Sequence, residues 1–166
     1  CRVMKKTILI LSLFIGLLVT SSGFNKTSLN TSIGKELPEI ACDEINKVLE
    51  QCERDGKYVL INFWSTTDGS SRQTVNDYTT WLKTHGNNKI DLLAVNFDKS
   101  ERLFKEIVRR DGLNDEMQFN VSGNQARQIM DEFHLEKGYG SLLVSPSGQI
   151  VYHNPTREDL SRIAGV

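Results

Sequence analysis

Cysteine and proline are scarce in this chain, with three residues of each among 166. Three cysteines are too few for a small scaffold held together by disulfides, and three prolines exclude a collagen-like or proline-rich chain. Neither sign of charge is in excess, because 20 Lys and Arg stand against 21 Asp and Glu, for a net charge of -1. This balance lacks the positive surface that nucleic acids require, so we expect no nucleic-acid partner.

The composition is that of a globular protein, with 39% hydrophobic and 25% charged residues. A chain of this length can form one domain whose core needs no disulfide support. The three histidines, His85, His134 and His153, are isolated from one another and show no metal-ligand spacing. We therefore expect neither a metal nor a cofactor.

The N-terminal segment has the features of a secretory signal. Three basic residues among the first six precede an apolar run from Ile8 to Val19, and the small residues Thr20-Ser-Ser-Gly follow. The apolar run is shorter than the roughly 20 residues that span a bilayer. We interpret 1–23 as a cleaved signal peptide, with an uncleaved anchor as the alternative. The mature protein is expected to be periplasmic or secreted, with no membrane span.

The rest of the chain divides into a linker and one domain. Residues 24–39 are rich in Ser, Thr, Asn and Lys without apolar periodicity, which predicts a linker. Residues 40–166 alternate helical and extended patterns. We expect helices over 43–55, 70–84, 100–110, 123–134 and 155–163, and strands over 58–64, 90–97, 117–121, 141–144 and 149–152. This order predicts an α/β fold with a mixed sheet, helices on both faces and a C-terminal β-hairpin.

Two segments carry a family resemblance. Residues 59–72 read V-L-I-N-F-W-S-T-T-D-G-S-S-R, and residues 140–150 read G-S-L-L-V-S-P-S-G-Q-I. The first is similar to the strand-to-helix junction V-L-V-N-F-W-A-x-W-C-G-P-C-R of the thioredoxin superfamily, and the second to its hairpin P-T-x-F-L-I-D-x-x-G-K-I. The chain resembles the exported bacterial thioredoxin-like proteins of that superfamily. The resemblance implies a thioredoxin-like domain over 40–166.

The chain departs from this family at both of its functional hallmarks. The redox dithiol Cys-Gly-Pro-Cys is replaced by Asp68-Gly-Ser-Ser71, and disulfide exchange requires an attacking thiolate and a second thiol. A serine hydroxyl cannot replace the thiol, and no histidine adjoins Ser71 in sequence as a base. Tyr139 stands where the family has a cis-proline, so we expect a trans bond between Gly138 and Tyr139. We therefore predict no catalytic residue.

The former active site is still a candidate binding surface. Asp68 is expected to cap the following helix, because a carboxylate accepts backbone N–H bonds there and favours the positive end of the helix dipole. Trp64 is either a core aromatic or a surface residue of the former groove, and we favour the surface, with Tyr139 near it. The predicted binding residues are Trp64, Asp68, Gly69, Ser70, Ser71 and Tyr139. The expected partner is a protein or peptide of the cell envelope.

Two other functions remain open from the sequence. The chain could be a thiol-disulfide oxidoreductase that uses Cys42 or Cys52, or a structural piece of a larger envelope assembly. On one straight helix, ten residues separate these two cysteines by about 15 Å along the axis, too far for a disulfide. Cys52 lies on the apolar stripe of its helix, where cysteine is more often a small core residue.

Overall fold

A five-stranded mixed sheet forms the centre of the computed structural model, which describes residues 31–85 and 88–166. The predicted signal segment 1–23 lies outside the described residues. The strands have the spatial order β3-β2-β1-β4-β5. Strands β1, β2 and β3 run parallel, and β4 and β5 form the antiparallel hairpin beside β1. Their bounds are β1 Tyr58–Trp64, β2 Ile90–Asn96, β3 Gln118–Asn120, β4 Ser141–Val144 and β5 Ile150–His153.

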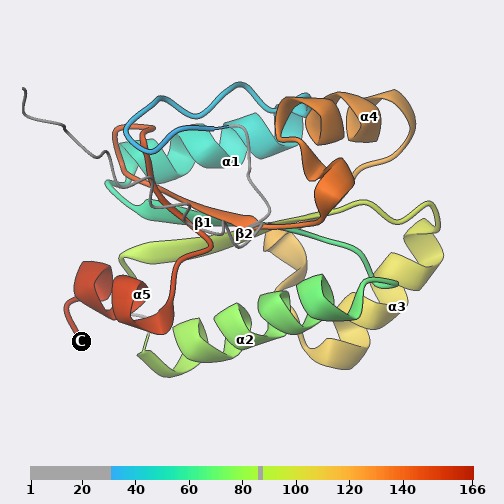
Figure 1. Cartoon of the computed structure of the whole chain (residues 1–166). Helices are drawn as coiled ribbons and strands as arrows, with labels where there is room; N and C mark the ends of the chain where they lie inside the picture. Colours follow the sequence, from blue (N-terminus) through green and yellow to red (C-terminus); the bar gives the residue numbers. More distant parts are fainter. Residues whose placement is uncertain (1–30, 86–87) are drawn as a thin grey trace, which may run out of the picture.

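Helices cover both faces of this sheet (Figure 1). One face is covered by α1 and α4, and the other by α2, α3 and α5. The bounds are α1 Asp43–Arg54, α2 Gly69–His85, α3 Glu101–Asp111, α4 Gly123–Glu132 and α5 Arg157–Ala164, with short 3₁₀ turns at Asp115–Met117 and Leu135–Lys137. The predicted α/β fold with a mixed sheet and a C-terminal hairpin is confirmed. Among the described helices, none is both long and apolar enough to cross a bilayer.

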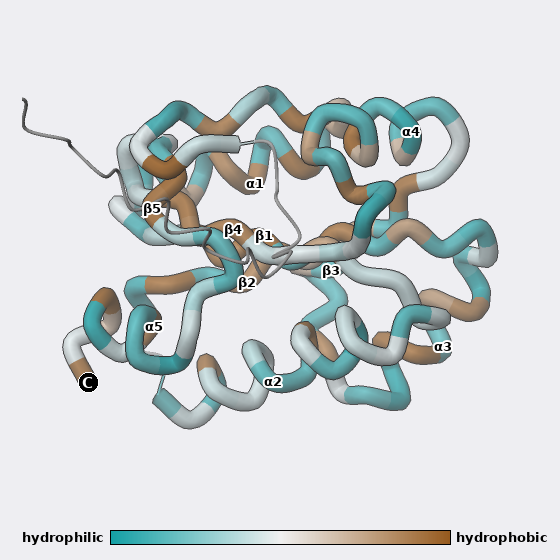
Figure 2. The backbone as a smooth tube through the Cα atoms, viewed as in Figure 1, coloured by the Kyte–Doolittle hydropathy of each residue, from teal (hydrophilic) through white to brown (hydrophobic). Residues whose placement is uncertain are grey.

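The central strand β1 is buried on both faces. It is hydrophobic along most of its length, between helices whose outer surfaces are hydrophilic (Figure 2). Successive side chains of a strand point to opposite faces, so Val59, Ile61 and Phe63 share one face and the alternate residues share the other. Those three residues belong to the core beneath α1 and α4. The second face of β1 therefore presents the intervening residues, including Asn62, to α2.

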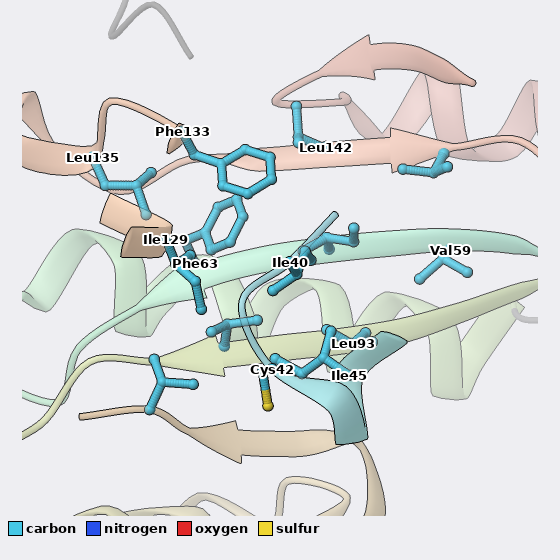
Figure 3. Packing of buried hydrophobic residues seen from close by; sticks show 14 of the residues in the cluster. Ile40, Cys42, Ile45, Val59, Phe63, Leu93, Ile129, Phe133, Leu135 and Leu142 are labelled. Carbon is cyan, nitrogen blue, oxygen red and sulfur yellow. The ribbon is translucent and has the colours of Figure 1, made fainter. Parts of the chain in front are cut away.

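The largest core cluster lies between the sheet and the layer of α1 and α4 (Figure 3). Phe63 of β1 and Phe133, just after α4, face each other with ring centroids 5.0 Å apart. Both rings are fully buried. Burial of a large apolar side chain contributes about 1.5–3 kcal/mol, so this pair fixes α4 on the sheet.

Two helical side chains show which sides of α2 and α3 pack on the sheet. Leu103 of α3 is 38% exposed, while Val108 is buried beside Phe104 and Ile107. Trp81 of α2 is buried against the hairpin side of the sheet.

The predicted linker is described from residue 31 onward, and its later part contacts the hairpin. The Gly34 N–H donates to the Ile150 carbonyl at 2.8 Å, and the Leu37 N–H donates to the Gly148 carbonyl at 2.9 Å. Leu37 also packs against the core cluster under α1. The segment 34–37 therefore lies along the edge strand β5.

Candidate functional site

The start of α2 is capped by Asp68. Its Oδ1 accepts a hydrogen bond from the Ser71 backbone N–H at 2.7 Å, three residues into the helix. This is the N-cap interaction that the sequence predicts, and its contribution is about 1 kcal/mol. The carboxylate therefore occupies the place where the related dithiol motif begins.

The Ser71 hydroxyl is fully engaged with the backbone. Its Oγ accepts the Ser65 N–H at 3.2 Å and donates to the Asp68 carbonyl at 3.2 Å. Ser71 is only 6% exposed, and neither of these partners is a base. The hydroxyl joins the end of β1 to the start of α2, and it has no activated oxygen for nucleophilic attack.

Tyr139 lines the same pocket as Asp68 and Ser71. Its ring stacks on Phe97, with centroids 5.6 Å apart and an interplanar angle of 24°. Burial raises the pKa of its phenol, and the nearby negative charges of Asp68 and Asp98 raise it further. No cis peptide bond occurs among the described residues, so the Gly138–Tyr139 bond is trans as predicted. Tyr139 therefore presents a neutral, half-buried ring.

Trp64 corrects the prediction of a groove-lining aromatic. The residue is fully buried, and its ring packs on Phe104 of α3 at a centroid distance of 6.1 Å. As the last residue of β1, it points to the face covered by α2 and α3, where it joins Val75 in an apolar cluster. It is a core aromatic, and the aromatic partner of Tyr139 is Phe97 instead.

The remaining predicted side chains converge on one pocket of about 190 Å³. Asp68, Ser70, Ser71 and Tyr139 all line it, while Gly69 belongs to the helix start between them. The pocket also contacts the hairpin and the end of β1, and its full lining is Asn62, Phe63, Asp68, Ser70, Ser71, Thr74, Gly138, Tyr139, Gly140, Ser141 and Asn154. We call this the α2 pocket.

Asn62 is a pocket residue that the sequence prediction did not include. Its Oδ1 accepts a hydrogen bond from the Ser141 hydroxyl at 2.8 Å, and the residue is 1% exposed. Its Nδ2 is buried and makes no hydrogen bond within the described part of the chain. A single amide in the otherwise apolar run 58–64 is the sequence signal that could have marked it.

A buried carboxylate supports the loop that leads into the site. Asp98 is 6% exposed, and its oxygens accept hydrogen bonds from the Ser65 hydroxyl at 2.7 Å and the Thr66 N–H at 3.1 Å. The Asn96 amide donates to it at 3.0 Å. The Asn120 amide donates to the Asp98 carbonyl, also at 3.0 Å. These contacts join the carboxyl ends of three parallel strands to the β1–α2 loop.

The two cysteines lie away from the α2 pocket. Neither Cys42 nor Cys52 lines it, and both are buried and free. Cys42 lies in the core beside Ile45 (Figure 3). Burial raises the pKa of the Cys52 thiol to about 11, with the Asp91 carboxylate adding to the effect. Burial also raises the pKa of Cys42. Both thiols are protonated at neutral pH, so neither is a ready nucleophile.

We expect these thiols to resist alkylation in the folded protein. A rise of two units above an ordinary pKa near 9 lowers the thiolate fraction of Cys52 at pH 8 about 100-fold. Iodoacetamide labelling of Cys52 should therefore be about 100-fold slower in the folded than in the urea-unfolded protein, and labelling of Cys42 should also be slower. Peptide mapping of the labelled sites measures this. Rapid labelling of either cysteine in the folded protein would revive the oxidoreductase hypothesis.

The described residues hold no group of three or more His, Cys, Asp or Glu side chains that could bind a metal ion. The polar side chains of the α2 pocket are one carboxylate, two amides, hydroxyls and a phenol. This arrangement can bind and orient a polar group. It contains no sulfur for disulfide exchange.

Comparisons with known proteins identify relatives of the same fold. No family model matches the sequence. The chain is 24% identical to the thiol-disulfide oxidoreductase ResA of Bacillus subtilis (strain 168) over 121 residues, which are 72% of this chain and 65% of ResA. This match spans less than two thirds of ResA.

Solved structures with a similar fold include two thioredoxin-like proteins. A thioredoxin-like protein from Parabacteroides distasonis superposes with a TM-score of 0.61 and 29% identity, covering 67% of this chain and 82% of that protein. A thiol:disulfide interchange protein from Bacteroides sp. has a TM-score of 0.64 at 18% identity, covering 81% and 88%. This chain therefore has the thioredoxin-like fold.

Proposed function

We propose that this protein is a redox-inactive thioredoxin-like module of the cell envelope that binds a protein or peptide through the α2 pocket. The observation that carries the proposal is the state of the two former dithiol positions. Asp68 caps α2 and Ser71 joins the loop to the helix, so both side chains are committed to structure. The pocket beside them persists without the sulfur chemistry of the relatives.

The size of the pocket favours a polypeptide ligand over a free cofactor. Sites for drug-sized molecules and cofactors typically measure about 300–1,000 Å³. The α2 pocket, at about 190 Å³, is large enough for one side chain of a longer ligand. The half-buried ring of Tyr139 adds a rigid aromatic contact at its rim, a residue type enriched in protein interfaces.

The envelope location rests on the N-terminal segment. Its basic start, apolar run and small-residue exit are those of an exported protein. An oxidoreductase based on Cys42 and Cys52 is the second candidate. It has the weaker support, because both thiols are buried and have raised pKa values.

Site-specific photo-crosslinking in the native host tests the proposal. A photoreactive residue replaces Thr74, which lines the pocket, or Thr80, which is exposed further along the same helix. We expect a discrete crosslinked polypeptide from position 74 and none from position 80. Tyr139→Ala should lower the yield about tenfold, because a buried aromatic contact is often worth more than 1.4 kcal/mol.

Tyr152→Ala is the matched control for this experiment. Tyr152 is also half-buried, but it lies on β5, outside the α2 pocket, where its hydroxyl accepts a hydrogen bond from Arg162. Its removal should leave the crosslink at position 74 unchanged. Equal crosslinking from positions 74 and 80, or full yield in Tyr139→Ala, would show that the pocket does not bind the partner.

A further inference from the structure

The outer edge of β2 is only partly covered by its neighbour β3. The ladder to β3 includes β2 residues from Ala94 to Asn96, whereas the ladder to β1 on the other side begins at Ile90. Strand β3 has only three residues, so it is too short to cover the whole edge. Within the described part of the chain, residues 90–93 of β2 therefore have a neighbouring strand on one side only.

The main chain of Ile90 and Leu92 faces this open side. Main-chain groups of a parallel strand point alternately toward its two neighbours. The Val121 N–H donates to the Asn96 carbonyl at 2.9 Å on the β3 side, so the even-numbered residues of β2 face outward. The described residues provide no hydrogen-bond partner for the N–H and C=O groups of Ile90 and Leu92. Two donors and two acceptors are therefore unpaired along this edge.

A cavity of about 370 Å³ lies beside the open edge. Its walls include Ile90, Asp91 and Leu92 in succession. Successive side chains point to opposite faces of a sheet, so a space that touches all three residues lies beside the strand. Two other walls agree, because Leu82 belongs to the core layer of α2 and α5, and Met117 to the layer of α1 and α4. We call this cavity the β2 notch.

We propose that the β2 notch binds a short extended segment of a partner polypeptide as an added strand. Main-chain groups at a sheet edge pair with the main chain of another strand, whose donors and acceptors repeat at the same two-residue spacing. The added segment continues the line of β3 along the edge of β2. This inference goes beyond the proposed function, since the notch shares no lining residue with the α2 pocket.

The walls of the notch indicate the side chains of the segment. Leu82 and Leu92 are half-buried and offer apolar surface on the α2 face of the sheet. Lys83 is exposed on the same wall, and its Nζ donates to the Gly112 carbonyl at 2.8 Å, a neutral acceptor that leaves its charge uncompensated. Charge complementarity favours an acidic residue two positions from an apolar one, because residues two apart share one face of a strand.

Titration of the ¹⁵N-labelled protein with the pentapeptide acetyl-Val-Glu-Val-Leu-Val-amide tests the notch. Two isomers of this peptide carry two N-methyl groups each, one on its second and fourth residues and the other on its third and fifth. N-methylation removes an N–H donor, so the isomers block opposite edges of the peptide. We expect the parent peptide to shift the backbone signals of Ile90 and Leu92 saturably. One isomer should bind as well, and the other at least about tenfold more weakly.

Hydrogen exchange in the free protein tests the open edge without a ligand. The Leu93 N–H faces β1, whereas the Leu92 N–H faces the notch. We expect the Leu92 amide to exchange at least about 100-fold faster than the Leu93 amide, and to slow when the peptide binds. Equal protection of the two amides in the free protein would show that the edge is closed.

Two variants test the walls of the notch. Thr79→Trp fills it from α2 and should weaken peptide binding at least about tenfold, while Thr80→Trp, exposed on the same helix outside the notch, should not. Lys83→Glu should weaken binding about threefold, and Lys47→Glu on the exposed side of α1 should have no effect. The second pair keeps the test decisive if Thr79→Trp does not fold.

The outcomes separate the β2 notch from the α2 pocket. Unmoved signals of Ile90 and Leu92, or equal binding by the two isomers, would overturn the added strand. Dimerisation of the free protein that protects the Leu92 amide would show that a second copy, not a different partner, fills the notch. The crosslink from position 74 should persist in Thr79→Trp, so failure of the notch leaves the function of the α2 pocket intact.

Discussion

The wild-type protein is expected to leave disulfide substrates unreduced, whereas Asp68→Cys/Ser71→Cys should reduce them at least about 100-fold faster than the wild-type background. The double variant restores a thiol at the N-cap of α2 and a second one three residues later. A thiolate at a helix N-terminus has a depressed pKa, because the unpaired N–H groups and the helix dipole stabilise its charge. The 2.7 Å contact between Asp68 Oδ1 and the Ser71 N–H shows that these positions share one turn. The measurement is reduction of a model disulfide with dithiothreitol as the final reductant.

Two controls make this result interpretable. Cys42→Ala/Cys52→Ala should be as silent as the wild type, because those thiols are buried away from the site. Asp68→Cys alone should form mixed disulfides without turnover, since no second thiol resolves them. Wild-type activity that disappears with the Cys42 and Cys52 pair would contradict the proposed function and move the active site to the first helix. If the double variant folds but does not reduce the model disulfide, other features needed for disulfide exchange are also missing from this protein.

The fold could be predicted because local patterns and tertiary packing agree over most of the domain. The run 58–64 is continuous and apolar, which indicates a strand covered on both faces, and β1 has these bounds. The turn residues Pro146 and Gly148 between two short apolar runs indicate the hairpin of β4 and β5. The local sequence does not show which side of a helix packs on the sheet, because elements distant in the chain decide this; Leu103, for example, is 38% exposed.

The candidate site was harder to predict, because its environment is created by residues distant in sequence. Asp68 could be assigned as a cap because its contact joins two residues that are only three positions apart in the sequence. The direction of Trp64 depends on α3, which supplies Phe104 from 40 positions further along the chain. The importance of Asn62 depends on Ser141, which is 79 residues away. Family resemblance located the site, but it could not show which side chains keep unpaired donors.

Removal of the Asp98 carboxylate is expected to destabilise the protein more than any change on the pocket surface. Asp98→Ala leaves three donors without their acceptor: the buried Ser65 hydroxyl and Asn96 amide, and the partly buried Thr66 N–H. Each unsatisfied donor costs about 1–3 kcal/mol, and water entering the new space compensates part of the sum. We expect a loss of about 3–5 kcal/mol in the free energy of unfolding, measured as a lower urea midpoint at an unchanged m-value.

Two further variants show whether this loss comes from the carboxylate itself. Asp98→Asn keeps the shape and one acceptor but turns an NH₂ group toward the neighbouring donors, so about half of the loss should remain. Asp77→Ala removes an exposed carboxylate from α2 and should change the free energy of unfolding by less than about 0.5 kcal/mol. Because Asp98 holds Ser65 and Thr66 just before the cap, its loss should also broaden the backbone NMR signals of residues 65–71. A change below about 1 kcal/mol in Asp98→Ala would show that solvent, not this carboxylate, satisfies the loop that leads into the site.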